Sequence, residues 1–302
     1  MQSLWMLLAG FMFSLMGVFV KLASVTYTIS EIVMSRGAIG IIIILVISKF
    51  QNLSLKTNFP LHHVSRGIIG VIAMWLWFYS ISILPLATAM TINYMSPIWI
   101  ASFIFFSSNT NYSKKMLYGL TISILCSFFG VAFLLKPSIQ SEQFFGGLIA
   151  LISSFLTAIA YIKISKLGKL GEPEFRVVFY FSLICFFFGI AGSFVENQAY
   201  GKNYFFEKKI TFNDLIFILC IGLSATIGQI TLTKAYHYGS MLLTANLQYS
   251  GIIFSSLWGI LIWKDTLNIL SWFGISIILL SGLGATFFRY LLTKNTNSNN
   301  FN

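Results

Sequence analysis

The chain has 302 residues, of which 57% are hydrophobic and only 9% are charged, whereas an average soluble domain has about 25% charged residues. A mean hydropathy of +0.84 excludes a soluble enzyme, a disordered chain and a fibrous protein, because a water-soluble fold cannot hide so much apolar surface. The net charge of +11 does not indicate nucleic-acid binding, since the basic residues lie in short gaps between apolar segments. An integral membrane protein with several spans remains.

Apolar runs of about 20 residues, the length a helix needs to cross a ~30 Å hydrocarbon layer, repeat along the whole chain. They are continuously apolar, whereas strands of a membrane barrel alternate, so we predict an all-α integral membrane protein with ten transmembrane helices. The first run lacks a basic n-region and a cleavage site, and we interpret it as a span. Pro85 is expected to form the tight turn between the third and fourth spans. The predicted spans are 4–21, 31–49, 67–84, 86–107, 117–135, 146–163, 177–195, 213–233, 240–262 and 270–291.

Charge asymmetry predicts the orientation of these spans. With a cytoplasmic N-terminus, twelve basic residues face the cytoplasm, Arg66 among them, six face out, and Arg36 lies within a span. The positive-inside rule then places both termini in the cytoplasm, and the polar segment 293–302 is expected to be a disordered cytoplasmic tail. We place the protein in a bacterial inner membrane, and its richness in Phe, Ile, Asn and Tyr is typical of the AT-rich genomes of host-dependent bacteria, in which uptake or exchange of a host metabolite would make sense.

The two halves of the chain are similar to each other. Residues 95–102 align with residues 249–256, and the second and seventh spans each carry an acid followed by an arginine near their start. We therefore predict one five-helix repeat over residues 1–137 and another over residues 146–292. Because five is odd, the copies would enter the membrane in opposite senses, and such inverted repeats are typical of alternating-access transporters. The alternative is a duplication kept for packing alone.

Several motifs resemble the EamA-type transporters of the drug/metabolite transporter superfamily. The resemblance covers almost the whole chain, and it implies two inverted five-helix repeats, a central cavity and carriage of small metabolites such as amino acids, nucleotide-like cofactors, vitamins or drugs. The chain departs from the family at residues 106–109 and at Asp265, where it lacks the usual glutamate, and these membrane-edge positions affect helix termination. The motifs are Arg66-Gly67, Trp75-Leu76-Trp77-Phe78-Tyr79, Leu86-Ala87-Thr88-Ala89, Ser96-Pro97-Ile98 and residues 247–254.

Polar residues at midplane depth are costly in a membrane unless they serve a cavity. In the fourth span, Asn93 and Ser96 share a face beside Pro97, which removes a backbone hydrogen bond. Serines and threonines often form bonds between helices, so for them we favour interhelical bonding, and for the amides we favour cavity lining. The polar stripes of the later spans are Thr226, Gln229 and Thr233, and Thr244, Gln248, Gly251 and Ser255.

Aromatic and charged side chains add further candidates. Tyrosines could stack on a planar substrate, although aromatics are also common in packing and in interfacial belts. Arg36 either extends outward to pair with Glu31 or draws an anionic group such as a carboxylate into the pore. The predicted substrate-binding residues are Asn93, Tyr94, Gln248, Tyr249, Gln229, Tyr79 and Arg36.

We therefore predict a transporter whose partners are a small-molecule solute and the lipid bilayer, with no nucleic acid, no metal and no cofactor. The three cysteines show no metal spacing, and no carboxylate lies deep in a span, so facilitated diffusion or exchange fits better than a proton relay. An intramembrane enzyme and a non-transporting scaffold are the alternatives, but neither HExxH nor GxSxG occurs. The sequence predicts neither substrate identity nor direction nor oligomeric state.

The orientation can be tested by thiol labelling of intact cells. We expect Lys56→Cys, Lys114→Cys and Lys169→Cys to be shielded from an impermeant reagent added outside, because the positive-inside rule places them in the cytoplasm. Lys202→Cys and Glu142→Cys should react. Labelling of the first set from outside would reverse the orientation, and the parent chain measures the background.

Overall fold

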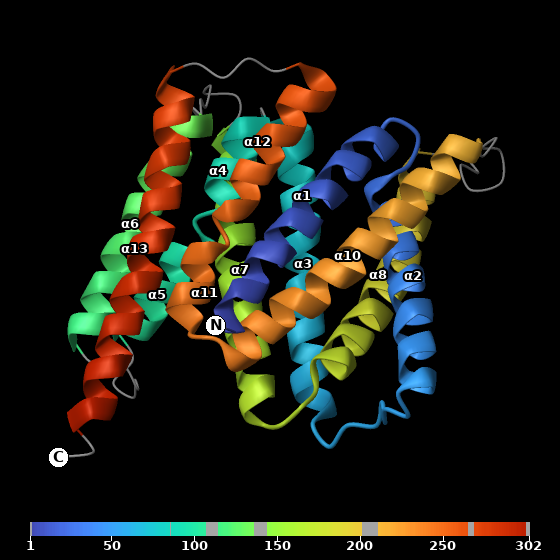
Figure 1. Cartoon of the computed structure of the whole chain (residues 1–302). Coiled ribbons are helices and arrows are strands. Elements are labelled where there is room, and N and C mark those ends of the chain that lie inside the picture. The colour runs from blue at the N-terminus through green and yellow to red at the C-terminus, as the bar shows by residue number, and fades with distance from the viewer. Residues whose placement is uncertain are drawn as a thin grey trace.

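The computed structural model describes residues 2–84, 86–106, 114–135, 144–200, 211–264 and 269–299, and no strand occurs in these ranges. Within these ranges, eight helices are long and apolar enough to cross a membrane, and two shorter apolar helices span Thr91–Phe106 and Ile269–Ala285. The all-helical fold is confirmed, and ten helical segments fit the predicted spans. Both ends of the chain lie on the same side of the bundle, as an even number of crossings requires (Figure 1).

The helices follow one another with short connections, after a 3-10 turn at Gln2–Leu4. The first half contains α1 (Trp5–Ala23), α2 (Ile29–Phe50), α3 (Pro60–Ile83), α4 (Leu86–Asn93), α5 (Ser96–Phe106) and α6 (Lys114–Leu135). The second half contains α7 (Phe144–Lys169), α8 (Glu174–Tyr200), α10 (Phe212–Tyr238), α11 (Met241–Leu247), α12 (Ser250–Trp263) and α13 (Ile269–Asn299).

Several helix ends differ from the expected spans. The helix α3 begins seven residues before the predicted residue 67, and α13 continues to Asn299, past residue 291 and into the expected tail. The reason at α3 is that Pro60 suits the first turn of a helix, where its missing N–H needs no partner, although the polar residues His62, His63, Ser65 and Arg66 follow it. The predicted turn at Pro85, residues 107–109 and Asp265 lie outside the described residues.

Two acids lie in the first turns of helices and cap them. Thr28 and Glu31 form a capping box at the start of α2, in which the Thr28 N–H donates to Glu31 Oε2 at 2.7 Å and the Glu31 N–H donates to Thr28 Oγ1 at 3.3 Å. Thr211 and Asp214 repeat this arrangement at α10. A capping box satisfies N–H groups that the first turn of a helix leaves unpaired, so these carboxylates stabilise the helix starts.

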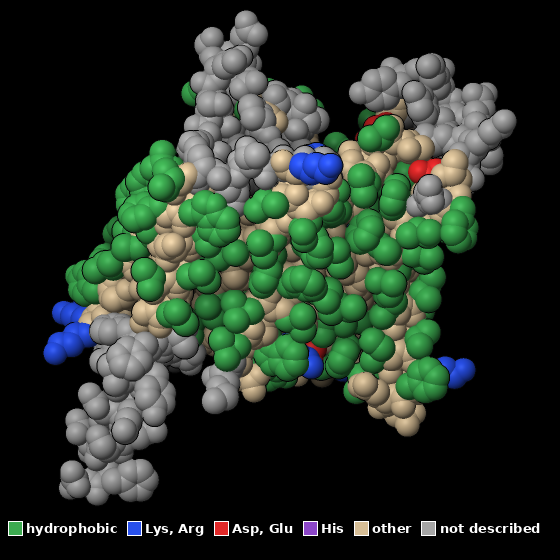
Figure 2. All heavy atoms as spheres, turned by 45° about the horizontal axis from the view of Figure 1, so that its top comes forward, with side chains coloured by type: hydrophobic (Ala, Val, Ile, Leu, Met, Phe, Trp, Pro, Cys, Tyr) green, Lys and Arg blue, Asp and Glu red, His purple; other side chains and the backbone are tan. Residues whose placement is uncertain are grey.

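The outer surface is suited to lipid. Hydrophobic side chains cover most of the described face seen in Figure 2, and Lys and Arg lie at its margins. Phe194 and Leu283 are each 68% exposed, and a soluble protein rarely exposes so continuous an apolar surface. The observed surface is that of a multi-pass membrane protein.

The main helix pairs are related by exchange of the two halves. The helix α2 packs on α8 and α6 packs on α13, so each contacts the helix five spans later. If α1 is exchanged with α7, and α10 with α3, the contact of α1 with α10 becomes the contact of α7 with α3, which is also present. In the same way, the contact of α1 with α12 becomes that of α7 with α4 and α5. The packing scheme is therefore unchanged when the first five spans take the places of the second five.

Glycines allow α2 and α8 to approach closely. A Cβ on Gly37 would lie 2.6 Å from the Phe186 nitrogen, and one on Gly189 would lie 2.5 Å from the Met34 nitrogen. Met34 precedes Gly37 by three residues, as Phe186 precedes Gly189, so the contact is the same from either helix. Small residues permit such backbone approach in membrane helices.

We expect Gly37→Ala and Gly189→Ala each to lower the melting temperature in detergent, because the methyl group must push α2 and α8 apart. Overpacking of this kind costs about 1–3 kcal/mol. Gly284→Ala is the matched control, since a Cβ there would meet nothing within 4 Å. Equal melting temperatures for all three variants would contradict the close approach.

Candidate functional site

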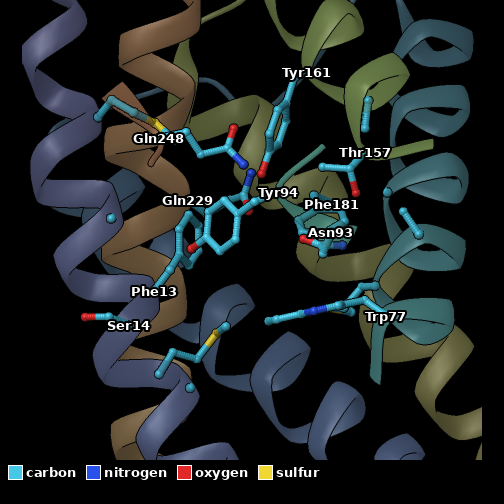
Figure 3. A pocket seen from close by; sticks show the side chains of 18 of the residues that line it. Phe13, Ser14, Trp77, Asn93, Tyr94, Thr157, Tyr161, Phe181, Gln229 and Gln248 are labelled. Atoms are coloured by element: carbon cyan, nitrogen blue, oxygen red, sulfur yellow. The ribbon is translucent and has the colours of Figure 1, made fainter. Parts of the chain in front are cut away.

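A cavity of about 160 Å³ lies in the centre of the bundle. Helices α1, α2, α3, α7, α8 and α10 line it, together with residues of the α4–α5 and α11–α12 segments. In Figure 3, Tyr161, Gln248 and Gln229 point toward the same region, and Trp77 lies across from them. Both halves of the chain therefore contribute polar side chains to one interior site.

Two helix breaks meet beside this cavity. The first separates α4 from α5 at Tyr94 and Met95, and the second separates α11 from α12 at Gln248 and Tyr249. The rings of Tyr94 and Tyr249 have centroids 6.2 Å apart. Interrupted backbone is tolerated at membrane depth where it is buried in protein or lines a cavity, and both conditions hold here.

Pro97 explains the position of the first break. It is the second residue of α5, where a helix needs no N–H donor. The Gln248 Nε2 group donates to Ser96 Oγ at 3.2 Å, so the two breaks are also joined by a direct hydrogen bond between side chains.

The three predicted amides all line the cavity, but their hydrogen bonding differs. Asn93 Nδ2 donates to Ser153 Oγ at 3.3 Å. Gln248 bonds Ser96 and accepts from the Tyr236 hydroxyl at the long distance of 3.5 Å. The Nε2 group of Gln229 is buried and has no hydrogen-bond partner among the described residues. Asn93 and Gln248 thus connect helices as well as lining the cavity, whereas Gln229 keeps an open donor.

The hydroxyl groups of the polar stripes bond mostly to backbone. Thr226 donates to the Gly222 carbonyl and Thr233 to the Gln229 carbonyl, both at 2.7 Å within α10. Thr244 donates to the Ala235 carbonyl at 3.1 Å and so connects α11 with α10. These hydroxyls have partners without a ligand, but the expected bonding between helices is found only at Thr244, because Thr226 and Thr233 bond within their own helix.

The aromatic candidates separate by helix face. Tyr94 lines the cavity, and Tyr249 is fully buried behind it. Trp77 lines the cavity, whereas Tyr79 is 45% exposed and is not part of the lining. Two residues along a helix turn the side chain by about 200°, so Trp77 and Tyr79 face opposite ways and the structure does not bring Tyr79 to the site.

Arg36 lies inside the cavity wall and does not extend to the membrane edge. It is 8% exposed, its Nη1 lies 2.7 Å from Met74 Sδ, and its Cζ lies 5.4 Å from the centre of the Phe181 ring. The expected alternative partner, Glu31, completes the cap of α2. Arg36 therefore faces the space between the helices.

Sequence reasoning missed a second arginine. Arg66 was expected in the cytoplasm, but it is 3% exposed, it lines the cavity, and its Cζ lies 3.7 Å from the same Phe181 ring centre. The early start of α3 at Pro60 brings Arg66 into the helix, which corrects its assignment. That proline was the available signal.

A polar cluster joins helix connections on the side of the chain termini. Glu172 accepts hydrogen bonds from Thr57 Oγ1 and His63 Nε2, each at 2.9 Å, and from Arg176 Nη1 at 3.0 Å. Burial alone raises the pKa of Glu172, but the hydrogen bonds from His63, Arg176 and Thr57 outweigh it and hold the pKa below the ordinary value of 4.5. Arg176 also donates to the Ser54 carbonyl at 2.9 Å. The cluster ties the α2–α3 connection to the α7–α8 connection.

Comparisons with known proteins agree with this architecture. Residues 1–136 match the EamA-like transporter family. A pseudopaline exporter of Pseudomonas aeruginosa is 28% identical over 258 residues, covering 85% of this chain and 86% of the exporter. A transporter of Helicobacter pylori is 27% identical over 281 residues, covering 92% and 91%. An S-adenosylmethionine uptake transporter of Rickettsia bellii is 24% identical over 207 residues, covering 68% and 65%.

A solved crystal structure is similar with a TM-score of 0.76 and 16% identity, covering 94% of this chain and 98% of the other. At that identity the likeness shows the fold alone. Because residues 1–136 match the family and transporters align along most of the chain, the resemblance to EamA-type transporters of the drug/metabolite transporter superfamily is confirmed.

Proposed function

We propose that this protein moves a small organic metabolite across a bacterial inner membrane by alternating access through the central cavity. The observation that carries the proposal is the cavity itself, which lies between membrane helices and is lined by amide, hydroxyl and guanidinium groups. Such groups are costly at this depth and typically mark a substrate pathway. The transporters that align with the chain support the same reading.

We further propose that residues 1–137 and 146–292 are inverted repeats that rock against each other. The exchange of the two halves in the helix pairs supports this, as does the meeting of the two broken helices beside the cavity. Substrate sites of many transporters lie at such a repeat interface, on discontinuous helices. The orientation with cytoplasmic termini rests on charge asymmetry, with Lys166 and Lys169 ending α7 on that side.

Proteoliposomes that contain the purified protein test the proposal. Uptake or exchange of labelled amino acids, organic acids, nucleosides, S-adenosylmethionine and vitamins should exceed that of protein-free vesicles for at least one solute. Thr157→Phe is the matched control, because Thr157 lines the cavity and a larger ring there would fill it. Equal flux for the parent and this variant would show that solute does not pass through the cavity.

Two glutamines of the cavity should respond differently. Gln229→Ala should weaken binding of the transported solute about tenfold, or about 1.4 kcal/mol, with little change in melting temperature, because its Nε2 group has no partner within the described chain. Gln248→Ala should lower both affinity and melting temperature, since it also removes the bond to Ser96. Affinity and thermal unfolding are measured on the same preparations, and unchanged affinity in both variants would contradict the cavity assignment.

The cluster around Glu172 must separate if this end of the bundle opens. We expect Glu172→Gln to lower the melting temperature at pH 7, corresponding to about 1–3 kcal/mol, and to speed labelling of a cysteine placed at Thr157. Because the folded-state pKa of Glu172 is depressed, its contribution is present above pH 4.5 and is lost as the pH falls through the lower value. The difference between parent and variant should therefore shrink in acid.

The control for this comparison is Lys49→Gln, which removes an exposed charge on the same side of the protein. It should leave the melting temperature and the labelling rate unchanged. A Glu172→Gln protein that behaves like this control would show that the cluster does not hold the end closed.

A further inference from the structure

Several fully buried donor atoms on the cavity wall have no hydrogen-bond partner within the described part of the chain. Among the described residues that line it, the buried side-chain atoms without a partner are Nε and Nη1 of Arg66, Nε1 of Trp77 and Nε2 of Gln229. A buried donor without an acceptor costs about 1–3 kcal/mol. Four such atoms on side chains of one cavity wall favour a ligand rich in acceptors, toward which these side chains can turn.

The cavity wall is also positively charged, which favours the same kind of ligand as the unpaired donors do. Arg36 and Arg66 are both more than nine-tenths buried, and both guanidinium groups lie against the Phe181 ring. Their known contacts are an aromatic face and the Met74 sulfur, which offer weak compensation for two positive charges. Arginine stays charged in proteins, and a buried charge needs an opposite charge nearby.

The carboxylates of the described chain are engaged elsewhere. Glu31 and Asp214 cap helices, Glu172 binds His63 and Arg176, and Glu174 pairs with Lys234 at 3.2 Å. Glu196 accepts from Ser30 at 2.7 Å. None of these five acids belongs to the cavity lining. No carboxylate of the described lining therefore offsets the charge of the two arginines.

We infer that the cavity binds a small organic anion through its carboxylate groups, with Arg66 and Arg36 as the charged contacts and Gln229 and Trp77 as neutral donors. This deepens the proposed transport function and rests on it for the fate of the ligand. A planar guanidinium matches a carboxylate with two parallel hydrogen bonds. The same wall disfavours solutes with net positive charge, because the described lining offers no acid to meet them.

Gly70 adds room for this arrangement. It lies one turn after Arg66 on α3, and a Cβ there would be 3.1 Å from a Phe181 ring carbon and 3.2 Å from Arg66 Nη1. A side chain at position 70 would therefore crowd the guanidinium and the ring together. Gly70→Ala keeps both charges and disturbs only their placement, which makes it a useful variant.

Thermal unfolding of the detergent-solubilised parent protein, with and without added solute, tests the inference. Succinate, citrate and glutamate serve as carboxylate probes, succinamide as the uncharged isostere of succinate, and inorganic phosphate and choline as the other comparisons. We expect at least one carboxylate to raise the melting temperature in a saturable way, and succinamide and choline not to do so. Stabilisation by phosphate or choline with none by the carboxylates would overturn the inference.

The variants locate the binding. Arg66→Gln and Arg36→Gln should each weaken the carboxylate affinity at least about tenfold, and the lysine variants should recover part of it, because a point charge attracts without the two-bond geometry. Without ligand, Arg66→Gln should melt no lower than the parent, since it removes an uncompensated buried charge. Gly70→Ala should weaken affinity with the charges intact, and Lys49→Gln should bind as the parent does.

The outcomes separate the site from the transport function. Carboxylate binding that both arginine variants lose, without flux in proteoliposomes, would keep the anion site and contradict transport. Flux of solutes that carry no carboxylate, with no carboxylate binding to the parent, would keep transport and overturn the anion site. Arginine variants that melt lower and bind carboxylates with unchanged affinity would show a structural role for both guanidinium groups and would also overturn it.

Discussion

Hydrocarbon offers no hydrogen-bond partner, so each polar group of a membrane helix must be satisfied by the protein, by water in a cavity or by a ligand. The polar residues of this chain sort by that requirement. Hydroxyls such as Thr226 and Thr233 return to carbonyls of their own helix, and acids such as Glu31 cap helix starts. Among the described residues, some buried polar atoms keep no partner, and four of these, all donors, belong to side chains that line the central cavity. The cavity wall therefore combines a space between helices with donors that the protein itself does not satisfy.

The cavity depends on helix packing that is close in some places and interrupted in others. Gly37 and Gly189 let α2 and α8 touch through their backbones, which fixes one side of the bundle. On another side, the α4–α5 and α11–α12 segments pass from α-helix into tighter turns near Tyr94 and Tyr249, where N–H groups bond to the carbonyl three residues earlier. The bond from Gln248 to Ser96 joins these breaks. The same pair of segments therefore supplies both a contact between the halves and part of the cavity wall.

Most of the fold could be predicted from the sequence, because a membrane helix must be continuously apolar for about 20 residues. The helix ends could not be predicted, because a helix can begin or end several residues away from the apolar run inside it. Arg66 shows the consequence: hydropathy begins its span at residue 67, whereas Pro60 begins the helix, and a residue assigned to the cytoplasm lies in the cavity. Helix face was equally hidden, because the run containing Trp77 and Tyr79 is aromatic on both sides and only packing shows that Trp77 points inward.

Similarity to known transporters predicts the fold of this chain but does not predict its substrate. The aligned relatives include an exporter of pseudopaline and an uptake transporter for S-adenosylmethionine, so one architecture serves different solutes and opposite directions. Selectivity must then depend on the few side chains that face the cavity, because transporters of different solutes share the same fold. In this chain the charged side chains of the described lining are Arg36 and Arg66, and none of the described acids joins them there. The anion site that we infer therefore predicts that the charge of the solute, more than its size or shape, decides which solutes bind.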